Sequence, residues 1–182
     1  MKFALGLLVT SFLLAGCGDD PFLVRWRANP TEAVLFALDR EELNKVSAFD
    51  MFFRTGVVIE RSITEDQWDF AVERQGGQMM ILPPGALGVE STAALVPFAG
   101  TEYDEVMRAP TDTLLYVSEE PIPVDLTAIY VVRTHQQAGS FGGACVYYGK
   151  IQPLEVDLEV GTFRFLFDSS PDCNNRSLVP TR

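Results

Sequence analysis

Residues 154–167 read Leu-Glu-Val-Asp-Leu-Glu-Val-Gly-Thr-Phe-Arg-Phe-Leu-Phe and carry the clearest local signal in the chain. Apolar and acidic residues alternate up to Val160, and a phenylalanine stands at every second position from Phe163 to Phe167. A period of two is typical of a β-strand whose two faces meet different surroundings. Gly161 separates the two runs and provides a turn. The stretch therefore predicts two antiparallel strands, each with one buried face and one solvated face.

A second hairpin is predicted upstream of this one. Trp68, Phe70 and Val72 occupy alternate positions, which places them on one face of a strand. A glycine pair at 76–77 then provides a turn before the apolar run Met79–Leu82. The prolines that follow end this run, because proline cannot donate a hydrogen bond to a neighbouring strand.

Strand signals recur along the rest of the chain. Further strands are predicted at Ala33–Leu38, Val57–Ile59, Ile129–Thr134 and Cys145–Ile151. Asn29–Glu32 also resembles a helix start, so a helix stays open as an alternative to the first of these strands. A helix is expected at Thr101–Arg108 and a helical turn at Glu41–Asn44. Residues 23–182 are thus predicted to form a single all-β domain. It is expected to be an antiparallel β-sandwich or barrel with one or two short helical segments.

The first residues have the pattern of an export signal. Lys2 precedes the uncharged run Phe3–Leu14, which is shorter than the ~20 apolar residues that span a bilayer. The run leads into Leu14-Ala15-Gly16-Cys17, which resembles the lipobox of bacterial lipoproteins. The resemblance implies cleavage before Cys17 and two or three acyl chains on it, enough for stable anchoring. An ordinary cleaved signal followed by a chance cysteine is the alternative. We therefore predict a signal peptide at 1–16 and a lipidated tether at 17–22.

Composition limits the partners of the chain. Hydrophobic residues make up 47% of the 182 residues, which is enough for the core of one domain. The formal net charge is −11, and it becomes −12 when Lys2 is removed with the signal peptide. Such a surface repels phosphate backbones and anionic head groups. We therefore expect no nucleic-acid partner, and we expect the acyl chains rather than charge to hold the protein at the lipid bilayer.

Two cysteines remain if Cys17 carries lipid. Export permits disulfides, and an even remainder predicts a bond between Cys145 and Cys173. Closing a loop of about 28 residues should contribute roughly 3–4 kcal/mol. A metal site that combines these cysteines with His135 is the alternative, although the three lack the close spacing of zinc ligands.

Catalytic motifs are not recognisable in the chain. The glycine-rich stretch 139–143 has the wrong spacing for a nucleophile elbow, and paired-histidine and CxxC motifs are absent. His135 is the single histidine, so any Ser-His-acid triad would have to use it. Its place beside the glycine-rich stretch favours a solvated strand end, with a ligand contact as the alternative. Segment 168–175 is rich in the oxygens that calcium prefers, but the same residue types also form turns.

Several fragments, in order between Trp68 and Phe167, resemble the HmuY-like family of haem-binding lipoproteins. They are Trp68–Val72 with the glycine pair 76–77, Tyr103–Val106 with Ala109-Pro110, Tyr130–Thr134, Tyr148–Ile151 and Phe163–Phe165. The resemblance implies an all-β, membrane-anchored, non-enzymatic binding protein outside the cytoplasm, with haem or porphyrin as ligand. Haem ligation in that family uses paired histidine or methionine side chains. With one histidine, a site here would pair His135 with Met79 or Met80, although strand methionines more often fill a core.

The sequence as a whole predicts a non-enzymatic envelope lipoprotein that faces the periplasm or the cell surface, with the outer membrane favoured. Its expected partner is a small molecule or another envelope protein. Haem binding and an envelope hydrolase that uses His135 or paired acids are the alternatives. A binder should have a concave pocket, whereas a hydrolase should place His135 beside a hydroxyl and an acid. A scaffold should instead have an exposed apolar patch.

Overall fold

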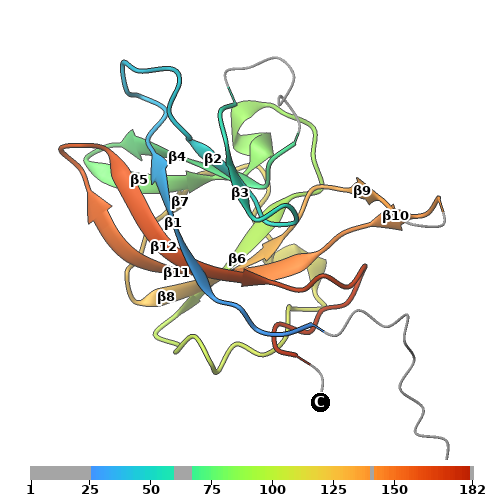
Figure 1. Ribbon diagram of the computed structural model, residues 1–182. Helices are drawn as coiled ribbons and strands as arrows, with labels where there is room; N and C mark the ends of the chain where they lie inside the picture. The colour runs from blue at the N-terminus through green and yellow to red at the C-terminus, as the bar shows by residue number, and fades with distance from the viewer. Residues whose placement is uncertain (1–25, 60–66, 140–141, 181–182) are drawn as a thin grey trace, which may run out of the picture.

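The computed structural model describes residues 26–59, 67–139 and 142–180. The predicted signal peptide 1–16, the lipidated Cys17 and the tether 17–22 lie outside these residues. In the described part, two five-stranded antiparallel sheets face each other, as Figure 1 shows. The all-β prediction is therefore confirmed.

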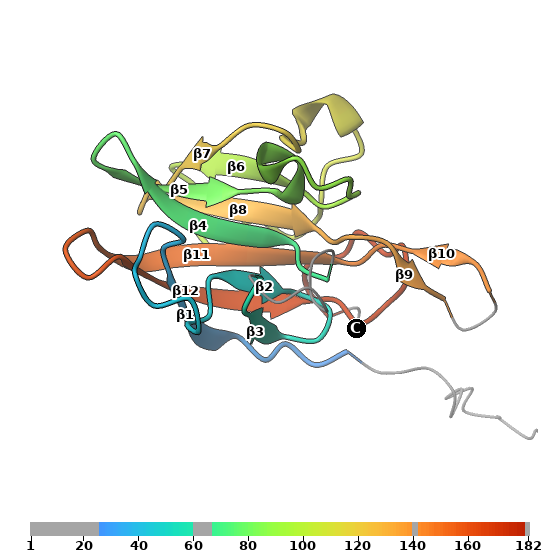
Figure 2. The same cartoon turned by 90° about the horizontal axis from the view of Figure 1, so that it is seen from above.

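The strands follow one another in each sheet in a non-sequential order. The first sheet has the order β1 (Thr31–Phe36), β12 (Thr162–Ser169), β11 (Tyr148–Asp157), β8 (Ala128–Arg133) and β6 (Ala94–Ala99). The second sheet has the order β3 (Thr55–Val57), β2 (Ala48–Asp50), β4 (Phe70–Gln75), β5 (Gln78–Leu82) and β7 (Ile122–Pro123). A separate pair, β9 (Gln137–Ala138) and β10 (Ala144–Cys145), projects from one end of the sandwich (Figure 2). The 3-10 helices of the described part are η2 (Pro84–Leu87) and η3 (Thr113–Leu115).

Both predicted hairpins are present. β11 and β12 pair around Gly161, whose φ of +77° suits glycine, and β4 and β5 pair around the glycines at 76–77. Phe163, Phe165 and Phe167 all point into the core between the sheets, as the alternation indicates. β11 ends at Asp157, so the last apolar residues before Gly161 lie in the turn and are exposed.

The core between the sheets is rich in aromatic rings. Phe49 from β2 contacts Phe165 and Phe167 edge-on, with ring centroids 5.3 and 4.6 Å apart. Edge-to-face packing of this kind stabilises a core beyond the burial of apolar area. These contacts join the second sheet to the first sheet.

The chain also closes one edge of the sandwich directly after β1. The backbone N–H of Ala37 donates to the Gly161 carbonyl at 2.7 Å, on the side of the first sheet. The next N–H, of Leu38, donates to the Val72 carbonyl on β4 at 2.9 Å. These two hydrogen bonds connect the first sheet to the second along this edge, so the sandwich is closed there as a barrel would be.

Parts of both sheets are covered on their outer faces too, whereas Glu32, Glu155 and Arg164 on the outer face of β1, β11 and β12 are exposed, as expected of a solvated face. In β8, Tyr130 points into the core between the sheets, whereas Val131 packs into a second cluster on the other side. Val106 and Leu178 belong to this second cluster, so the segments that contain them cover the first sheet. The predicted solvated face is therefore present over β1, β12 and β11, whereas the outer face of β8 is covered by other parts of the chain.

Trp68 lies on the opposite side of the second sheet from its predicted position. It packs with Ala71 and Leu82 in a third cluster, away from Phe70 and Val72 in the core. The reason is that β4 begins only at Phe70, so the strand periodicity does not extend to Trp68.

The predicted helix at Thr101–Arg108 is wrong. The carbonyls of Tyr103 and Val106 accept hydrogen bonds from the Lys150 ammonium at 2.6 and 3.0 Å. The residues that follow pair with the C-terminal segment 176–178. The backbone groups of this segment thus find tertiary partners instead of the local partners of a helix.

Several other boundaries differ from the prediction. A strand rather than a helix follows Asn29, and β3 ends at Val57 instead of continuing to residue 59. Glu41–Asn44 contains bends and a turn but no helix. The Arg40 guanidinium bridges the two ends of this loop by donating to the Ala37 and Lys45 carbonyls, at 2.9 and 2.6 Å.

Candidate functional site

The carboxylate of Asp69 connects three separate chain segments. Asp69 directly precedes β4 and is fully buried. Its Oδ2 accepts a hydrogen bond from the backbone N–H of Met51, just after β2, at 2.7 Å. Its Oδ1 accepts from both the backbone N–H and the Nδ1 of His135, each at 2.7 Å. His135 lies between β8 and β9, so this carboxylate joins the first sheet to the second at one end of the sandwich.

His135 is held in a defined orientation by this contact. A carboxylate only accepts hydrogen bonds, so the Nδ1 of the ring carries a hydrogen. The Nε2 pairs with the side-chain amide of Gln137, so both ring nitrogens are engaged. The residue is only 8% exposed, so the predicted solvated position at a strand end is wrong.

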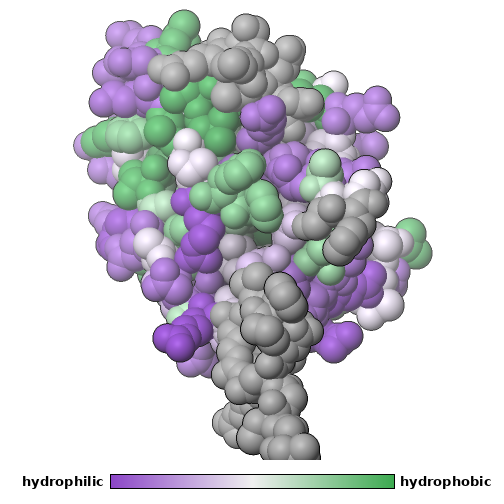
Figure 3. Space-filling view, turned by 45° about the vertical axis from the view of Figure 1, so that its right-hand side comes forward, coloured by the Kyte–Doolittle hydropathy of each residue, from purple (hydrophilic) through white to green (hydrophobic). Residues whose placement is uncertain are grey.

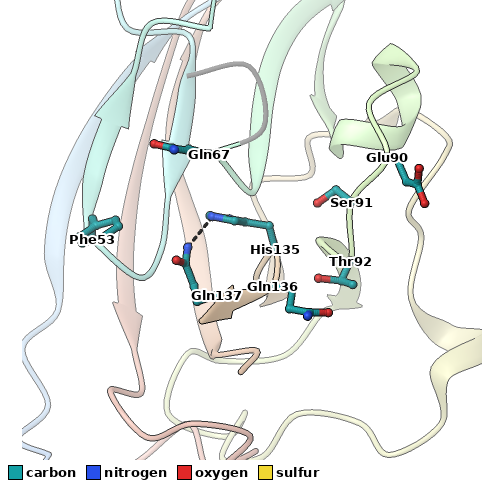
Figure 4. A pocket seen from close by; sticks show the side chains of 8 residues that line it. All are labelled: Phe53, Gln67, Glu90, Ser91, Thr92, His135, Gln136 and Gln137. Atoms are coloured by element: carbon teal, nitrogen blue, oxygen red, sulfur yellow. Dashed lines mark hydrogen bonds between the residues drawn. The ribbon is translucent and has the colours of Figure 1, made fainter. Parts of the chain in front are cut away.

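A pocket of about 690 Å³ opens beside His135. Its volume lies within the range of small-molecule sites, ~300–1,000 Å³. The residues that line it are Phe53, Gln67, Glu90, Ser91, Thr92, His135, Gln136 and Gln137. Figure 4 shows His135 and Gln137 pointing toward each other, with Phe53 on the side opposite Glu90, Ser91 and Thr92. The pocket therefore combines one aromatic ring with mostly uncharged hydrogen-bonding groups.

The two hydroxyls of the pocket already have partners in the backbone. Ser91 Oγ accepts from the N–H of Ala93 at 3.1 Å, and Thr92 Oγ1 donates to the Thr134 carbonyl at 3.2 Å. Figure 4 shows Ser91 and Thr92 on the other side of the His135 ring from Gln137. His135 thus has an acid partner in Asp69, while the nitrogen that would activate a hydroxyl faces an amide.

A second buried carboxylate lies close to the pocket. Asp50, at the end of β2, is 2% exposed and accepts a hydrogen bond from the N–H of Phe53 at 2.9 Å. Burial raises the pKa of Asp50 above its usual 3.8, and the N–H groups of residues 52 and 53 oppose this rise. Phe53 and Gln67 line both the His135 pocket and a smaller cavity of about 270 Å³ beside Asp50.

The structure does not bring the predicted haem ligands together. Met79 is 2% exposed and fills the core between the sheets. Met80 points to the other face and packs against the cluster that contains Trp68. Neither methionine lines the pocket of His135.

The cysteine pairing is confirmed. Cys145 and Cys173 form a disulfide, with their Cα atoms 5.2 Å apart. Two hydrogen bonds between Val146 and Asn174, at 2.9 and 3.1 Å, run beside it. Together these contacts fasten the segment after β12 to the end of β10.

Metal ligation was the alternative for these cysteines and for the oxygen-rich segment 168–175. Within residues 26–59, 67–139 and 142–180, no group of three or more His, Cys, Asp or Glu side chains is placed to hold a metal ion. Asp168 instead forms an ion pair with Arg54 at 2.8 Å, and its Oδ2 accepts from the N–H of Asn29 at 3.0 Å.

Sequence reasoning missed Asp69 as a member of the site. The predicted alternation places Asp69 on the face of the strand opposite Trp68 and Phe70, where an acid is expected to be solvated. The available signal was a single acid inside an otherwise apolar stretch, together with a single histidine. No spacing rule links them, because they are 66 residues apart in the chain.

Several large apolar side chains of the described residues are exposed. Phe53, Leu114 and Val160 are 65, 91 and 62% exposed, and they lie in the β2–β3 turn, in η3 and in the β11–β12 turn. On the face that Figure 3 shows, green hydrophobic areas alternate with purple hydrophilic ones. Across the described residues, none of the helices has the length and apolar character that crossing a membrane requires.

Neither the scan against protein-family models nor the search of curated proteins finds a match to this chain. The site is therefore interpreted from its own geometry.

Proposed function

We propose that this protein is a non-catalytic ligand-binding module, anchored in a bacterial envelope membrane by acyl chains on Cys17 and facing the periplasm or the cell surface. The pocket beside His135 carries the proposal. It has the volume of a small-molecule site, and one of its walls is a histidine fixed by a buried carboxylate. A side chain held in this way loses little conformational entropy when a ligand binds.

The hydrogen bonds of the pocket favour binding over catalysis. A general base needs its Nε2 directed at the group that it deprotonates. In His135 that nitrogen pairs with Gln137, and the Thr92 hydroxyl donates to a backbone carbonyl. These contacts orient donors and acceptors for a ligand, but they do not assemble a nucleophile and a base.

Ligand binding is tested with the full-length protein in detergent. Native mass spectrometry should detect a bound small molecule, either co-purified or taken up from envelope extract. Gln137→Ala and Phe53→Ala should weaken its binding, whereas Gln78→Ala, at an exposed site on β5, should not. Equal binding by all three variants would rule out the His135 pocket as the site.

The anchor is supported by the lipobox resemblance at residues 14–17. Cys17→Ser removes the thiol that would carry the lipid. We expect this variant to lose acyl labelling and to leave the membrane fraction, because no single remaining group replaces two or three acyl chains. Membrane retention at the wild-type level would contradict the proposed anchor.

An envelope hydrolase is the second candidate, since Asp69, His135 and the Ser91 hydroxyl occur at one pocket. A fluorophosphonate probe labels an activated serine covalently. We expect no labelling at Ser91, because the Nε2 of His135 is engaged by Gln137. Labelling that Ser91→Ala and His135→Ala both abolish would establish the hydrolase instead.

Haem is tested in the same preparation by titration with haemin. Since Met79 and Met80 lie away from the pocket, we expect no saturable Soret shift that depends on them. A tight complex lost in Met79→Ala or Met80→Ala would restore the predicted His–Met pair.

A further inference from the structure

The lining of the His135 pocket is composed mainly of neutral groups that both donate and accept hydrogen bonds. Gln67, Gln136 and Gln137 contribute three side-chain amides, and Ser91 and Thr92 contribute two hydroxyls. Each amide offers an NH₂ donor and a carbonyl acceptor. A ligand hydroxyl likewise donates and accepts, so this set matches a molecule with several hydroxyls.

The charges of the described lining favour a neutral ligand over an anionic one. Among the residues that the structure describes, the lining contains no lysine or arginine, and Glu90 is its one carboxylate. An anionic ligand would therefore lack a counter-charge and would meet a chain of net charge −11. Asp69 is fully buried behind His135 and already accepts three hydrogen bonds, so its carboxylate is not presented to a ligand. A neutral ligand fits these charges best.

Phe53 adds an apolar surface to this polar lining. Its side chain is 65% exposed at the edge of the pocket. The Phe52 ring supports it edge-on, with centroids 4.8 Å apart, and Tyr147 lies 4.4 Å behind Phe52. An exposed ring that packs on another ring offers an apolar face at low entropic cost. The C–H face of a sugar ring is a suitable partner for such an aromatic face.

We infer that the pocket binds a neutral carbohydrate, as a free saccharide or as a residue of a glycan chain. This inference rests on the proposed ligand-binding function and names the ligand class of the same site. The glutamine amides bind the hydroxyls of the sugar, Phe53 stacks on its apolar face, and Glu90 accepts hydrogen bonds from one or two further hydroxyls.

The test uses calorimetry and ligand-observed NMR on the full-length protein with a panel of neutral hexoses, pentoses and disaccharides and a neutral polysaccharide. Glucose, glucosamine and glucuronic acid are included because they share one ring and differ in charge. We expect saturable binding of at least one neutral sugar. Its affinity should change less than about twofold between roughly 0.02 and 0.5 M salt, since no ion pair is involved. Binding of the polysaccharide alone assigns a glycan chain, whereas binding of the small sugars assigns a free saccharide.

Variants of the pocket residues distinguish specific binding from non-specific binding. Phe53→Ala should lower the affinity about tenfold, and Gln136→Ala about two- to tenfold, which is typical of one lost stacking contact or hydrogen bond. Both side chains are exposed, so both variants should fold. The matched controls are Leu114→Ala, at a 91% exposed apolar site in η3, and Gln78→Ala in β5, and neither should alter binding.

Failure of this inference is distinguishable from failure of the proposed function. If the native ligand proves to be charged and Phe53→Ala weakens it, the pocket binds a ligand but the carbohydrate assignment is overturned. If no member of the panel binds, the carbohydrate assignment is also overturned. If in addition no co-purified ligand depends on the pocket variants, the binding function fails with it.

Discussion

The two ends of the β4–β5 hairpin are held by different kinds of interaction. At the turn end, glycines at 76–77 have φ of +59° and +80°, and a partly exposed ion pair joins Arg74 to Asp39 at 2.9 Å. At the opposite end, Asp69 is fully buried and accepts three hydrogen bonds, two of them from a residue 66 positions away. Figure 2 shows the turn end pointing away from β9 and β10. The turn end depends on local conformation, whereas the site end depends on the packing of two sheets.

The largest effect is expected at the site end. Asp69→Ala would leave the buried N–H groups of Met51 and His135 without their acceptor. Each buried unsatisfied donor is costly, so the free energy of unfolding should fall by about 3–5 kcal/mol. Urea unfolding followed by tryptophan fluorescence measures this loss.

Asp39→Ala is the matched control at the turn end. It breaks the ion pair with Arg74, and it should cost less than about 1 kcal/mol because surface ion pairs contribute little. Equal losses for the two variants would contradict the contrast between the two ends.

The disulfide tests whether the site end needs a covalent link. The double variant Cys145→Ala/Cys173→Ala frees the segment after β12 from β10, and it should lower the unfolding free energy by about 3 kcal/mol. Reducing agent should lower the stability of the wild type by a similar amount and leave the variant unchanged. A wild type whose stability does not respond to reduction would show that the bond contributes nothing.

Gly77→Ala tests the turn end. At φ +80° an alanine is strained, and nothing lies near its added Cβ, so the cost is conformational and about 1–2 kcal/mol. Gly143→Ala is the control, because that glycine has open space and no positive φ in the structure. Thermal unfolding compares the two, and an unchanged melting temperature for Gly77→Ala would contradict the proposed role of the turn.

The smallest effect concerns the pH dependence at Asp50. Its folded pKa lies above the unfolded value of 3.8, so the folded state binds more protons and its stability falls as pH rises through this window. Asp50→Asn removes this charge. Its stability relative to the wild type should therefore improve from acid to neutral pH, by less than about 1 kcal/mol.

Asp125→Asn should change the pH dependence of the unfolding free energy in the opposite direction from Asp50→Asn. Hydrogen bonds from Thr127 lower the pKa of Asp125, so its charged form stabilises the fold above pH 3.8. Asp125→Asn should therefore lose stability relative to the wild type at neutral pH and regain it in acid. Unfolding curves across the pH range measure both variants. If the stability of both variants relative to the wild type changed in the same direction with pH, the causes assigned to the two pKa shifts would be contradicted.

Local features of the molecule were determined by the sequence itself. The alternation over 154–167 and the glycines at the turns predicted both hairpins, because side-chain period and positive φ are properties of a few neighbouring residues. Cysteine parity likewise predicted the bond between Cys145 and Cys173. The number and type of these residues were sufficient for these features.

The tertiary structure alone decided the rest. Residues 101–108 have a helical pattern, but Lys150 and the C-terminal segment take their backbone hydrogen bonds. Both faces of β8 are buried, because distant loops cover the outer face. Asp69 contacts His135 only because the two sheets pack together at that end of the sandwich. The two residues are 66 positions apart, and no periodicity or spacing rule in the sequence predicts a contact over that distance.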